Sequence, residues 1–307
     1  MFGRKSVRWS VVVAAPRPPA GDQWGDTVFA RDLVAALQRA GQQAKVVFRK
    51  GGESEAREED DVVLVLRGLQ RFIPRRRGER RPLWLLWVIS HPELVEPDEP
   101  DQYDAVFAAS AHWSRAGEFD IPVTPLLQAT APERFHPGAA PADSGADRLF
   151  VGSTRGEFRP SVRAAVEAGL DIDVHGVGWE EFLPADRIAG DFLDPADLPA
   201  AYASARVVMN DHWSDMAQEG FLSNRLFDVA ATGARLASDP ATGLTDVFGD
   251  VVRAAASPQE WRALLQRDPD EAFPSRNERL ELAARIAREH SFDARAEVLI
   301  DRVRALR

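Results

Sequence analysis

Two short apolar runs constrain the fold of this chain more than any other feature. Residues 61–66 are Asp-Val-Val-Leu-Val-Leu, and residues 83–89 are Leu-Trp-Leu-Leu-Trp-Val-Ile. Neither run alternates between apolar and polar residues, as a half-exposed strand would. Continuous apolar runs are typical of strands covered on both faces, which occur in parallel sheets flanked by helices. Both runs are shorter than the roughly 18 apolar residues of a membrane span. The sequence therefore predicts an α/β protein with mostly parallel sheets.

The first 48 residues have the spacing of a βαβ unit. An apolar strand is expected at residues 10–15, and a Pro- and Gly-rich loop follows it. Asp26 or Thr27 can cap a helix that runs to Ala40, and residues 44–48 form the next strand. Asp26 is thus either a helix cap or a polar group in a ligand cleft, and the sequence leaves both interpretations open.

The N-terminus shares some features with a secretion signal. Basic residues precede the apolar run at 9–15, but the run is short and no small-x-small cleavage site follows before Pro16. We therefore expect a buried first strand and a cytoplasmic protein. A periplasmic type of binding protein, which needs a convincing signal, is the alternative.

Composition excludes several classes of function. A length of 307 residues suits two domains, and a formal net charge of -10 argues against general nucleic-acid binding. The absence of cysteine excludes disulfides, thiolate metal sites and a cysteine nucleophile. Arginine greatly exceeds lysine and alanine is abundant, which indicates a high-GC bacterial source.

A candidate phosphate-binding loop follows the strand expected at residues 149–153. Gly152 and Ser153 end this strand, Arg155 and Arg159 lie in the loop, and Pro160 begins a helix. Backbone amides at a helix start and nearby cations favour an anion. We expect Arg155, and after it Arg159, to contact a pyrophosphate.

A second charged stretch lies at residues 219–234. Ser223 is a suitable N-cap for a helix that Gly233 ends, and Glu219 precedes this helix. Arg225 and Asp228 are three residues apart and share a helix face. Such a site offers a cation for phosphate and a carboxylate for ribose hydroxyls. A buried helix with a solvated Arg–Asp pair is the alternative.

Two histidines follow predicted strands directly, where open α/β sheets bind ligands. His91 comes after residues 83–89, and His175 ends the strand at 172–176. Asp171 and Asp173 match a DxD metal pattern, but a three-residue match arises easily by chance. We therefore expect no metal site.

Several motifs resemble retaining glycosyltransferases of the GT-B fold. They are Asn224-Arg225-Leu226-Phe227-Asp228, followed by Ala231-Thr232-Gly233-Ala234, then Phe150-Val151-Gly152-Ser153 and His290-Ser291-Phe292. The first pattern is most similar to group 1, family 4-like transferases of the spore-maturation-protein type, although many of these have Glu where Asp228 stands. The resemblance implies two Rossmann-like domains that face a cleft. Their expected limits are 1–140 and 141–290, with a final helix at 291–307 that packs toward the N-terminal domain.

The resemblance also implies an activity, the metal-independent transfer of a sugar from a UDP-, GDP- or dTDP-sugar, with retention. The nucleotide sugar is a co-substrate, and no cofactor is expected. The implied catalytic residues are Arg225, Arg155, His91 and Glu219. The implied substrate-binding residues are Asp228, Asn224, Ser223, Gly152, Ser153, Arg159, His175, Gly25 and Asp26.

The acceptor is expected to be a small molecule, a glycan or a protein, and we expect neither a nucleic-acid partner nor stable membrane insertion. A homodimer is considered. The basic loop at residues 75–81 either docks an acidic acceptor or a membrane surface or is simply solvated. A non-catalytic GT-B-like binding or scaffold protein is the main alternative. The missing GxGxxG fingerprint argues against a nicotinamide-dependent dehydrogenase.

Overall fold

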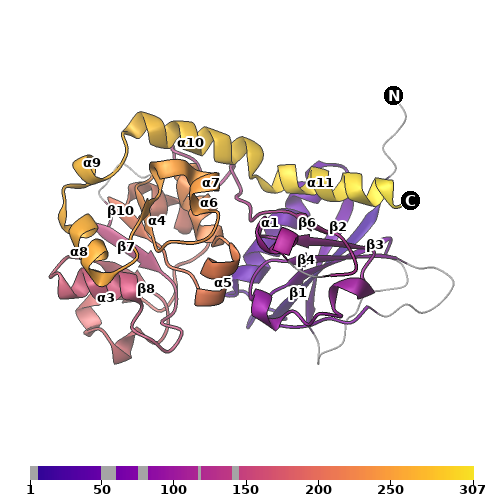
Figure 1. Ribbon diagram of the computed structural model, residues 1–307, viewed down its shortest axis with the longest axis horizontal. Helices are drawn as coiled ribbons and strands as arrows, with labels where there is room; N and C mark the ends of the chain where they lie inside the picture. The colour runs from indigo at the N-terminus through magenta and orange to yellow at the C-terminus, as the bar shows by residue number, and fades with distance from the viewer. Residues whose placement is uncertain (1–5, 50–59, 75–81, 117–118, 140–144) are drawn as a thin grey trace. The chain divides into compact units, whose positions relative to one another are not determined.

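The chain forms two compact units, each with its own sheet and core (Figure 1). The first unit comprises the residues up to Gln128, together with Ser214–Phe221 and Ser291–Arg307. The second comprises Ala129–Trp213 and Leu222–His290. The computed structural model describes residues 6–49, 60–74, 82–116, 119–139 and 145–307. The basic loop at 75–81 and part of the expected linker therefore lie outside the described residues.

The first unit ends earlier than the limit of 140 that the sequence suggests. Thr130 donates a hydrogen bond from its hydroxyl to Asp228 (2.8 Å), and its backbone amide donates to the carbonyl of His290 (2.9 Å). Phe135 stacks on Tyr202, with 6.1 Å between ring centres. These contacts make residues 129–139 part of the second unit.

The sheet of the first unit has six strands, and every pairing in it is parallel. Its order is β2 (Gln43–Arg49), β1 (Arg8–Pro16), β3 (Val62–Arg67), β4 (Leu83–Val88), β5 (Ala105–Ala108) and β6 (Val123–Pro125). β3 and β4 are the two continuous apolar runs, and both are buried along nearly their whole length. The prediction of parallel, doubly covered strands is therefore confirmed.

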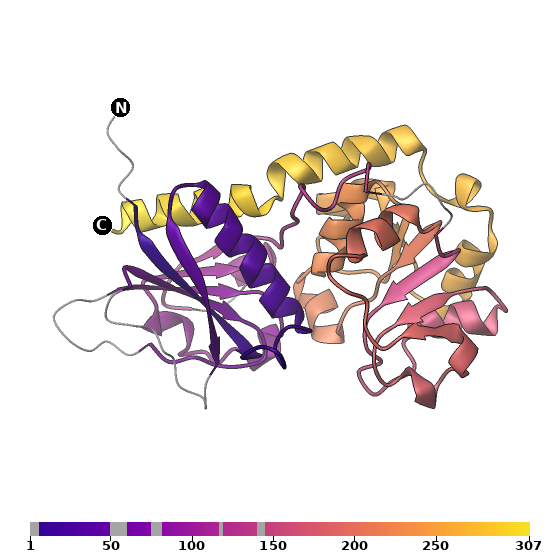
Figure 2. The same cartoon turned by 180° about the vertical axis from the view of Figure 1, so that it is seen from behind.

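The first unit's helices come from three separate parts of the chain. They are α1 (Gly25–Arg39), α2 (Trp113–Ala116), α5 (Ser214–Glu219) and α11 (Phe292–Ala305), with short 3-10 turns η1 (Pro92–Leu94) and η2 (Pro100–Gln102). α1 and α11 lie side by side (Figures 1 and 2), and Phe29 meets Phe292 edge-on with 4.8 Å between ring centres. Arg295 donates to the carbonyls of Leu127 and Gln128, which fixes α11 to the end of the first unit's main segment.

The second unit also has a six-stranded, all-parallel sheet. Its order is β12 (Arg253–Ala254), β11 (Leu236–Ser238), β10 (Val207–Met209), β7 (Arg148–Val151), β8 (Asp173–His175) and β9 (Ile188–Gly190). Its helices are α3 (Pro160–Glu167), α4 (Leu198–Ser204), α6 (Asn224–Thr232), α7 (Leu244–Phe248), α8 (Pro258–Gln266), α9 (Pro269–Ala272) and α10 (Arg276–Glu289), with 3-10 turns η3 (Trp179–Glu181), η4 (Ala185–Arg187) and η5 (Gly249–Val251). Aromatic residues such as Phe150, Trp179 and Trp261 fill its core.

The strand orders place one switch point in each sheet. In the first sheet, the order reverses between β1 and β3. In the second sheet it reverses between β7 and β10, and this second order is that of dinucleotide-binding folds. Open α/β sheets bind ligands beyond the carboxyl ends of strands at such points. The segments after these four strands therefore define where a site is expected. No helix among the described residues has the length and apolar character needed to cross a membrane.

Candidate functional site

Two glycines allow close approach of the chain at the switch point of the second sheet. β7 ends at Val151, and the chain then passes through Gly152. A side chain on Gly176, which follows β8, would lie 2.2 Å from the Gly152 carbonyl oxygen. A side chain on Gly152 would lie 3.0 Å from the nearer guanidinium nitrogen of Arg225. Position 176 therefore requires glycine, and a side chain on Gly152 would crowd the Arg225 guanidinium.

Arg225 is held directly at this switch point. From the start of α6, it donates one hydrogen bond to the side-chain oxygen of Asn210, which follows β10 (3.0 Å), and another to the carbonyl of Val151, the last residue of β7. Its guanidinium also lies 5.2 Å from the ring centre of Phe150. Arg225 therefore joins the two strands between which the sheet order reverses.

Arg155 supplies a second cation to the same place. Its backbone is left-handed (φ 60), and its guanidinium lies 4.3 Å from the ring centre of Trp213. Nη1 of Arg155 is buried without a hydrogen-bond partner. Burial, and then the positive charge of Arg225, lower the pKa of Arg155 to about 10. An anion between these two guanidiniums would supply the missing acceptor and offset their mutual repulsion.

Arg159, expected to contact a pyrophosphate, is occupied inside the protein. It is 1% exposed, donates to the carbonyls of Ser153 (2.9 Å) and Asp211 (3.2 Å), and forms an ion pair with the Asp211 carboxylate. Burial, and then the neighbouring cations Arg155 and Arg225, lower the pKa of Arg159, while the negative charges of Glu157 and Asp239 oppose this effect. Through these contacts Arg159 holds the loop that carries Arg155.

The start of α6 is fixed by a histidine that the sequence analysis did not single out for this task. Ser223 occupies the N-cap position, but its side chain makes no capping bond. Instead its backbone N–H donates to Nε2 of His212 (3.0 Å), while Nδ1 of His212 contacts Asp239 at 2.6 Å. Burial raises the pKa of Asp239, but the hydrogen bonds from His212 outweigh burial and lower it overall. The three residues form a relay, Asp239–His212–Ser223, under the helix that carries Arg225.

The side chains of Arg225 and Asp228 form hydrogen bonds with different groups. The Asp228 carboxylate accepts from the hydroxyl of Thr130 (2.8 Å) and from the amide nitrogen of Asn224 (2.8 Å). The amide oxygen of Asn224 is buried without a partner. The alternative of a simple solvated Arg–Asp pair therefore does not describe this helix. Gly233 ends α6 in the left-handed conformation (φ 73), as predicted.

The remaining second-unit candidates lie near the same strand ends. His175 is the last residue of β8; its Nδ1 is buried without a partner, and burial lowers its pKa. Ser153 is exposed. Asp171 and Asp173 are exposed as well, and the only group of three possible metal ligands that close together among the described residues lies elsewhere.

The switch point of the first sheet has different chemistry. Asp26 lies in the first turn of α1, and a side chain placed on Gly68, which follows β3, would be 3.2 Å from its carboxylate and 3.3 Å from the hydroxyl of Ser90. Burial raises the pKa of Asp26, and the nearby His91 partly offsets this. The side chain of Asp26 makes no capping bond to α1, for which Trp24 is the N-cap. Asp26 therefore lies among polar groups at the strand ends.

Two other expected residues also belong to the first unit. Gly25 is the exposed first residue of α1, and a side chain there would meet nothing within 4 Å. Glu219 ends α5, and its carbonyl accepts a hydrogen bond from Ser110 (2.5 Å). Glu219 is close to Arg225 and Asp228 in the sequence, but it belongs to the other unit because α5 packs there.

Known proteins resemble this chain in sequence over its second half and in fold. Residues 155–301 match the family model described as Glycosyl transferase-like. The match begins at Arg155 and includes Arg225 and Asp228. No curated protein matches the sequence.

Solved structures of glycosyltransferases share the fold over nearly the whole chain. One is AviGT4, a glycosyltransferase involved in avilamycin A biosynthesis, with 15% identity, a TM-score of 0.65 and 98% of each chain covered. The catalytic domain of starch synthase IV from Arabidopsis thaliana, bound to ADP and acarbose, has 10% identity and a TM-score of 0.62, with 97% of this chain and 99% of that one covered. T4 phage BGT in complex with UDP and Mn²⁺ has 10% identity and a TM-score of 0.59, with 98% and 99% covered.

The predicted GT-B fold is therefore confirmed. The family-model match covers residues 155–301, and the similar solved structures share the fold of the chain. The narrower resemblance to the spore-maturation-protein type stays a prediction.

Proposed function

We propose that this protein transfers a sugar from a nucleoside diphosphate sugar to an acceptor. One observation carries the proposal: Arg155 and Arg225 meet at the switch point of a sheet with dinucleotide-binding order, and no carboxylate among the described residues forms an ion pair with either. Two uncompensated guanidiniums beside glycine-lined strand ends suit a diphosphate.

The two arginines would act on the leaving group. Breaking the anomeric bond leaves a diphosphate whose negative charge grows in the transition state. Cations already held in place by Asn210, Val151 and Trp213 stabilise this charge without reorganising. We propose that this step needs no metal. One structural neighbour is described with both UDP and Mn²⁺, so metal dependence requires its own experiment.

Polar groups near the two arginines would contact the ribose and the sugar. The unpartnered amide oxygen of Asn224 is available to accept from a hydroxyl, and Asp228 orients it through the bond to its amide nitrogen. Ser153, Gly152 and His175 border the same strand ends. Retention of configuration, and membership of the spore-maturation-protein type, rest on the Asn224–Asp228 pattern.

The first unit would bind the acceptor. Asp26, Ser90 and His91 lie together near its switch point, where they can bind hydroxyl groups. A small molecule, a glycan or a protein side chain could supply such a group. We propose no specific acceptor.

Donor turnover tests this function. The protein would be incubated with UDP-, ADP-, GDP- and dTDP-glucose, with and without EDTA, and release of the nucleoside diphosphate measured. Glycosyltransferases hydrolyse donors slowly when water replaces the acceptor, so release with one base that persists in EDTA is expected. Arg225→Ala should abolish it, whereas Arg163→Ala, an exposed ion-paired arginine on α3, should not. Tight binding of a nucleotide without any release would favour the non-catalytic binding protein instead.

A further inference from the structure

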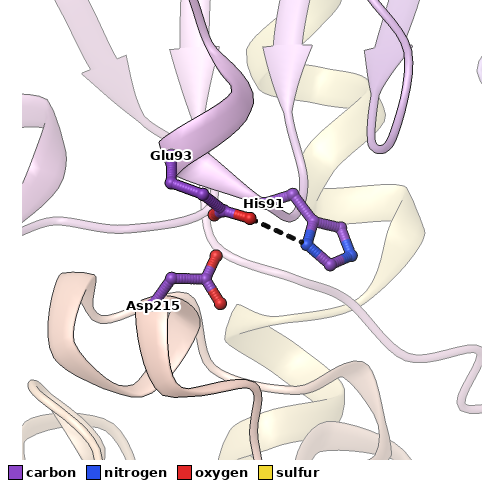
Figure 3. A group of neighbouring side chains, drawn as sticks. All are labelled: His91, Glu93 and Asp215. Atoms are coloured by element: carbon purple, nitrogen blue, oxygen red, sulfur yellow. Dashed lines mark hydrogen bonds and ion pairs between the residues drawn. The ribbon is translucent and has the colours of Figure 1, made fainter. Parts of the chain in front are cut away.

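Three possible metal ligands converge in the first unit (Figure 3). They are His91, Glu93 and Asp215, and one ligand atom from each lies within 4.8 Å of the other two. His91 and Glu93 flank the start of η1, just after β4. Asp215 lies in the first turn of α5, far away in sequence. In Figure 3 the carboxylates of Glu93 and Asp215 and the ring of His91 face a common space.

The backbone explains why these side chains face one another. His91 has a left-handed conformation (φ 53), which turns the chain sharply between β4 and η1. Pro92 then fixes the first residue of η1, so Glu93 follows His91 in a defined turn. α5 packs against η1 within the first unit and brings Asp215 to the same place.

The two carboxylates of this group differ in exposure: Glu93 is exposed and Asp215 is half-buried. Oδ2 of Asp215 is buried and has no hydrogen-bond partner. No lysine or arginine in the described part of the chain forms an ion pair with Glu93 or Asp215, and the Glu93 carboxylate lies 3.4 Å from Nδ1 of His91. A buried, unpartnered carboxylate oxygen is costly, and a second carboxylate nearby adds repulsion. A cation in the common space would remove both costs.

We propose that His91, Glu93 and Asp215 bind one divalent transition-metal cation. An imidazole nitrogen with two carboxylates suits Mn²⁺ or Zn²⁺ better than Mg²⁺ or Ca²⁺, which prefer oxygen ligands alone. Metal–ligand bonds of about 2.1 Å place neighbouring donors on one ion about 3.0–3.4 Å apart. The 3.4 Å contact between Nδ1 of His91 and the Glu93 carboxylate has this spacing. Binding would draw the Asp215 carboxylate inward to complete the set.

This site goes beyond the proposed function and replaces the expectation that the chain has no metal site. Its ligands all lie in the first unit, whereas the guanidiniums proposed to hold the diphosphate lie in the second. Three protein ligands leave coordination positions for water or for oxygen atoms of a bound acceptor. The cation would therefore serve the acceptor side, and donor binding in EDTA would remain.

Direct measurement of Mn²⁺ binding tests the proposal. The full-length protein would be treated with EDTA, desalted and titrated with Mn²⁺, and the free ion followed by its EPR signal. We expect one site per chain, which Zn²⁺ displaces. Asp215→Asn and Glu93→Gln should each weaken binding at least tenfold. Glu96→Gln, which alters an exposed glutamate three residues after Glu93, should leave binding unchanged.

A second measurement separates loss of the site from loss of folding. In EDTA, Asp215→Asn should unfold at the same temperature as the wild type or higher, because it removes repulsion between carboxylates. Added Mn²⁺ should raise the unfolding temperature of the wild type and of Glu96→Gln, but not of Asp215→Asn. Absence of a stoichiometric site in the wild type, or equal binding by Asp215→Asn and Glu93→Gln, would overturn the proposal. Because no nucleotide is present, neither result depends on the proposed donor site.

Discussion

The two units place opposite charges at the same topological position. At the switch point of the second sheet, two guanidiniums, Arg155 and Arg225, have no paired carboxylate among the described residues. At that of the first sheet, a half-buried carboxylate, Asp26, lies beside Ser90 and near His91. Both sheets are six-stranded and parallel, so the fold supplies the location but not the chemistry. The side chains after the strands decide which ligand each unit suits: an anion in the second, and hydroxyl groups or a cation in the first.

The largest effect is expected from removing the positive charge of the second switch point. Arg225→Ala should weaken binding of a nucleoside diphosphate about 100-fold, because a charged hydrogen-bonded partner of the phosphates is lost. Isothermal titration calorimetry measures this directly. The matched control is Arg163→Ala, whose guanidinium is exposed and paired with Glu167. An equal loss in both variants would show that the site is not at the switch point.

A comparison of two glycines tests how tightly each switch point is built. Gly176→Ala places a methyl group 2.2 Å from the Gly152 carbonyl at a backbone φ of +147, and overpacking of this kind costs about 1–3 kcal/mol. Gly25→Ala meets nothing within 4 Å, so its stability should stay near that of the wild type. Urea unfolding would measure both. Equal stabilities would contradict the close approach of β7 and β8.

Breaking the Asp239–His212–Ser223 relay should have a smaller effect on diphosphate affinity. His212→Phe removes the imidazole partner of Asp239 and the acceptor of the Ser223 backbone N–H, and leaving a buried polar group unpaired costs about 1–3 kcal/mol. Diphosphate affinity should fall by less than in Arg225→Ala, because the cation remains but its helix is less well fixed. His112→Phe, at an exposed histidine of the first unit, serves as the control. Unchanged stability in His212→Phe would show that the relay does not support the helix.

The smallest predicted effect is a pH dependence confined to the second unit. The pKa of Asp239 is lowered in the folded state, so its contribution to stability is present above its ordinary value of 3.8 and is lost as the pH falls below it. Asp239→Asn should therefore be less stable than the wild type at pH 7, and the difference should shrink in acid. Thermal unfolding between pH 3 and 7 checks this. A difference that stays constant with pH would contradict the shift.

Local patterns in the sequence were enough to predict most elements of both sheets. The continuous apolar runs at 61–66 and 83–89 became β3 and β4, and Gly233 ends α6 as its position suggested. The sequence of residues 194–202 suggests a helix, but α4 begins at Leu198. The Asp194 carboxylate accepts from the backbone N–H of Ala196 and holds a separate turn.

Tertiary contacts account for what the sequence did not predict. α5 belongs to the first unit because Met216 and Phe221 join the core around Trp113, and no local pattern states which sheet a six-residue helix will pack on. His212 and Asp239 are 27 residues apart, so their contact has no spacing signature. Arg159 lies in the same loop as Arg155, and the sequence gives both the same expected role. The structure shows that Arg159 is buried and ion-paired with Asp211.

The most direct test of the central claim compares a nucleoside, its monophosphate and its diphosphate in calorimetric titrations at two salt concentrations. We expect the affinity of the wild type to rise with each phosphate and to fall with salt. In the double variant Arg155→Met/Arg225→Met, the gain from the phosphates should disappear while binding of the nucleoside persists. A double variant that keeps the full gain, or a wild type that binds the nucleoside as tightly as the diphosphate, would contradict a diphosphate site at the switch point of the second sheet.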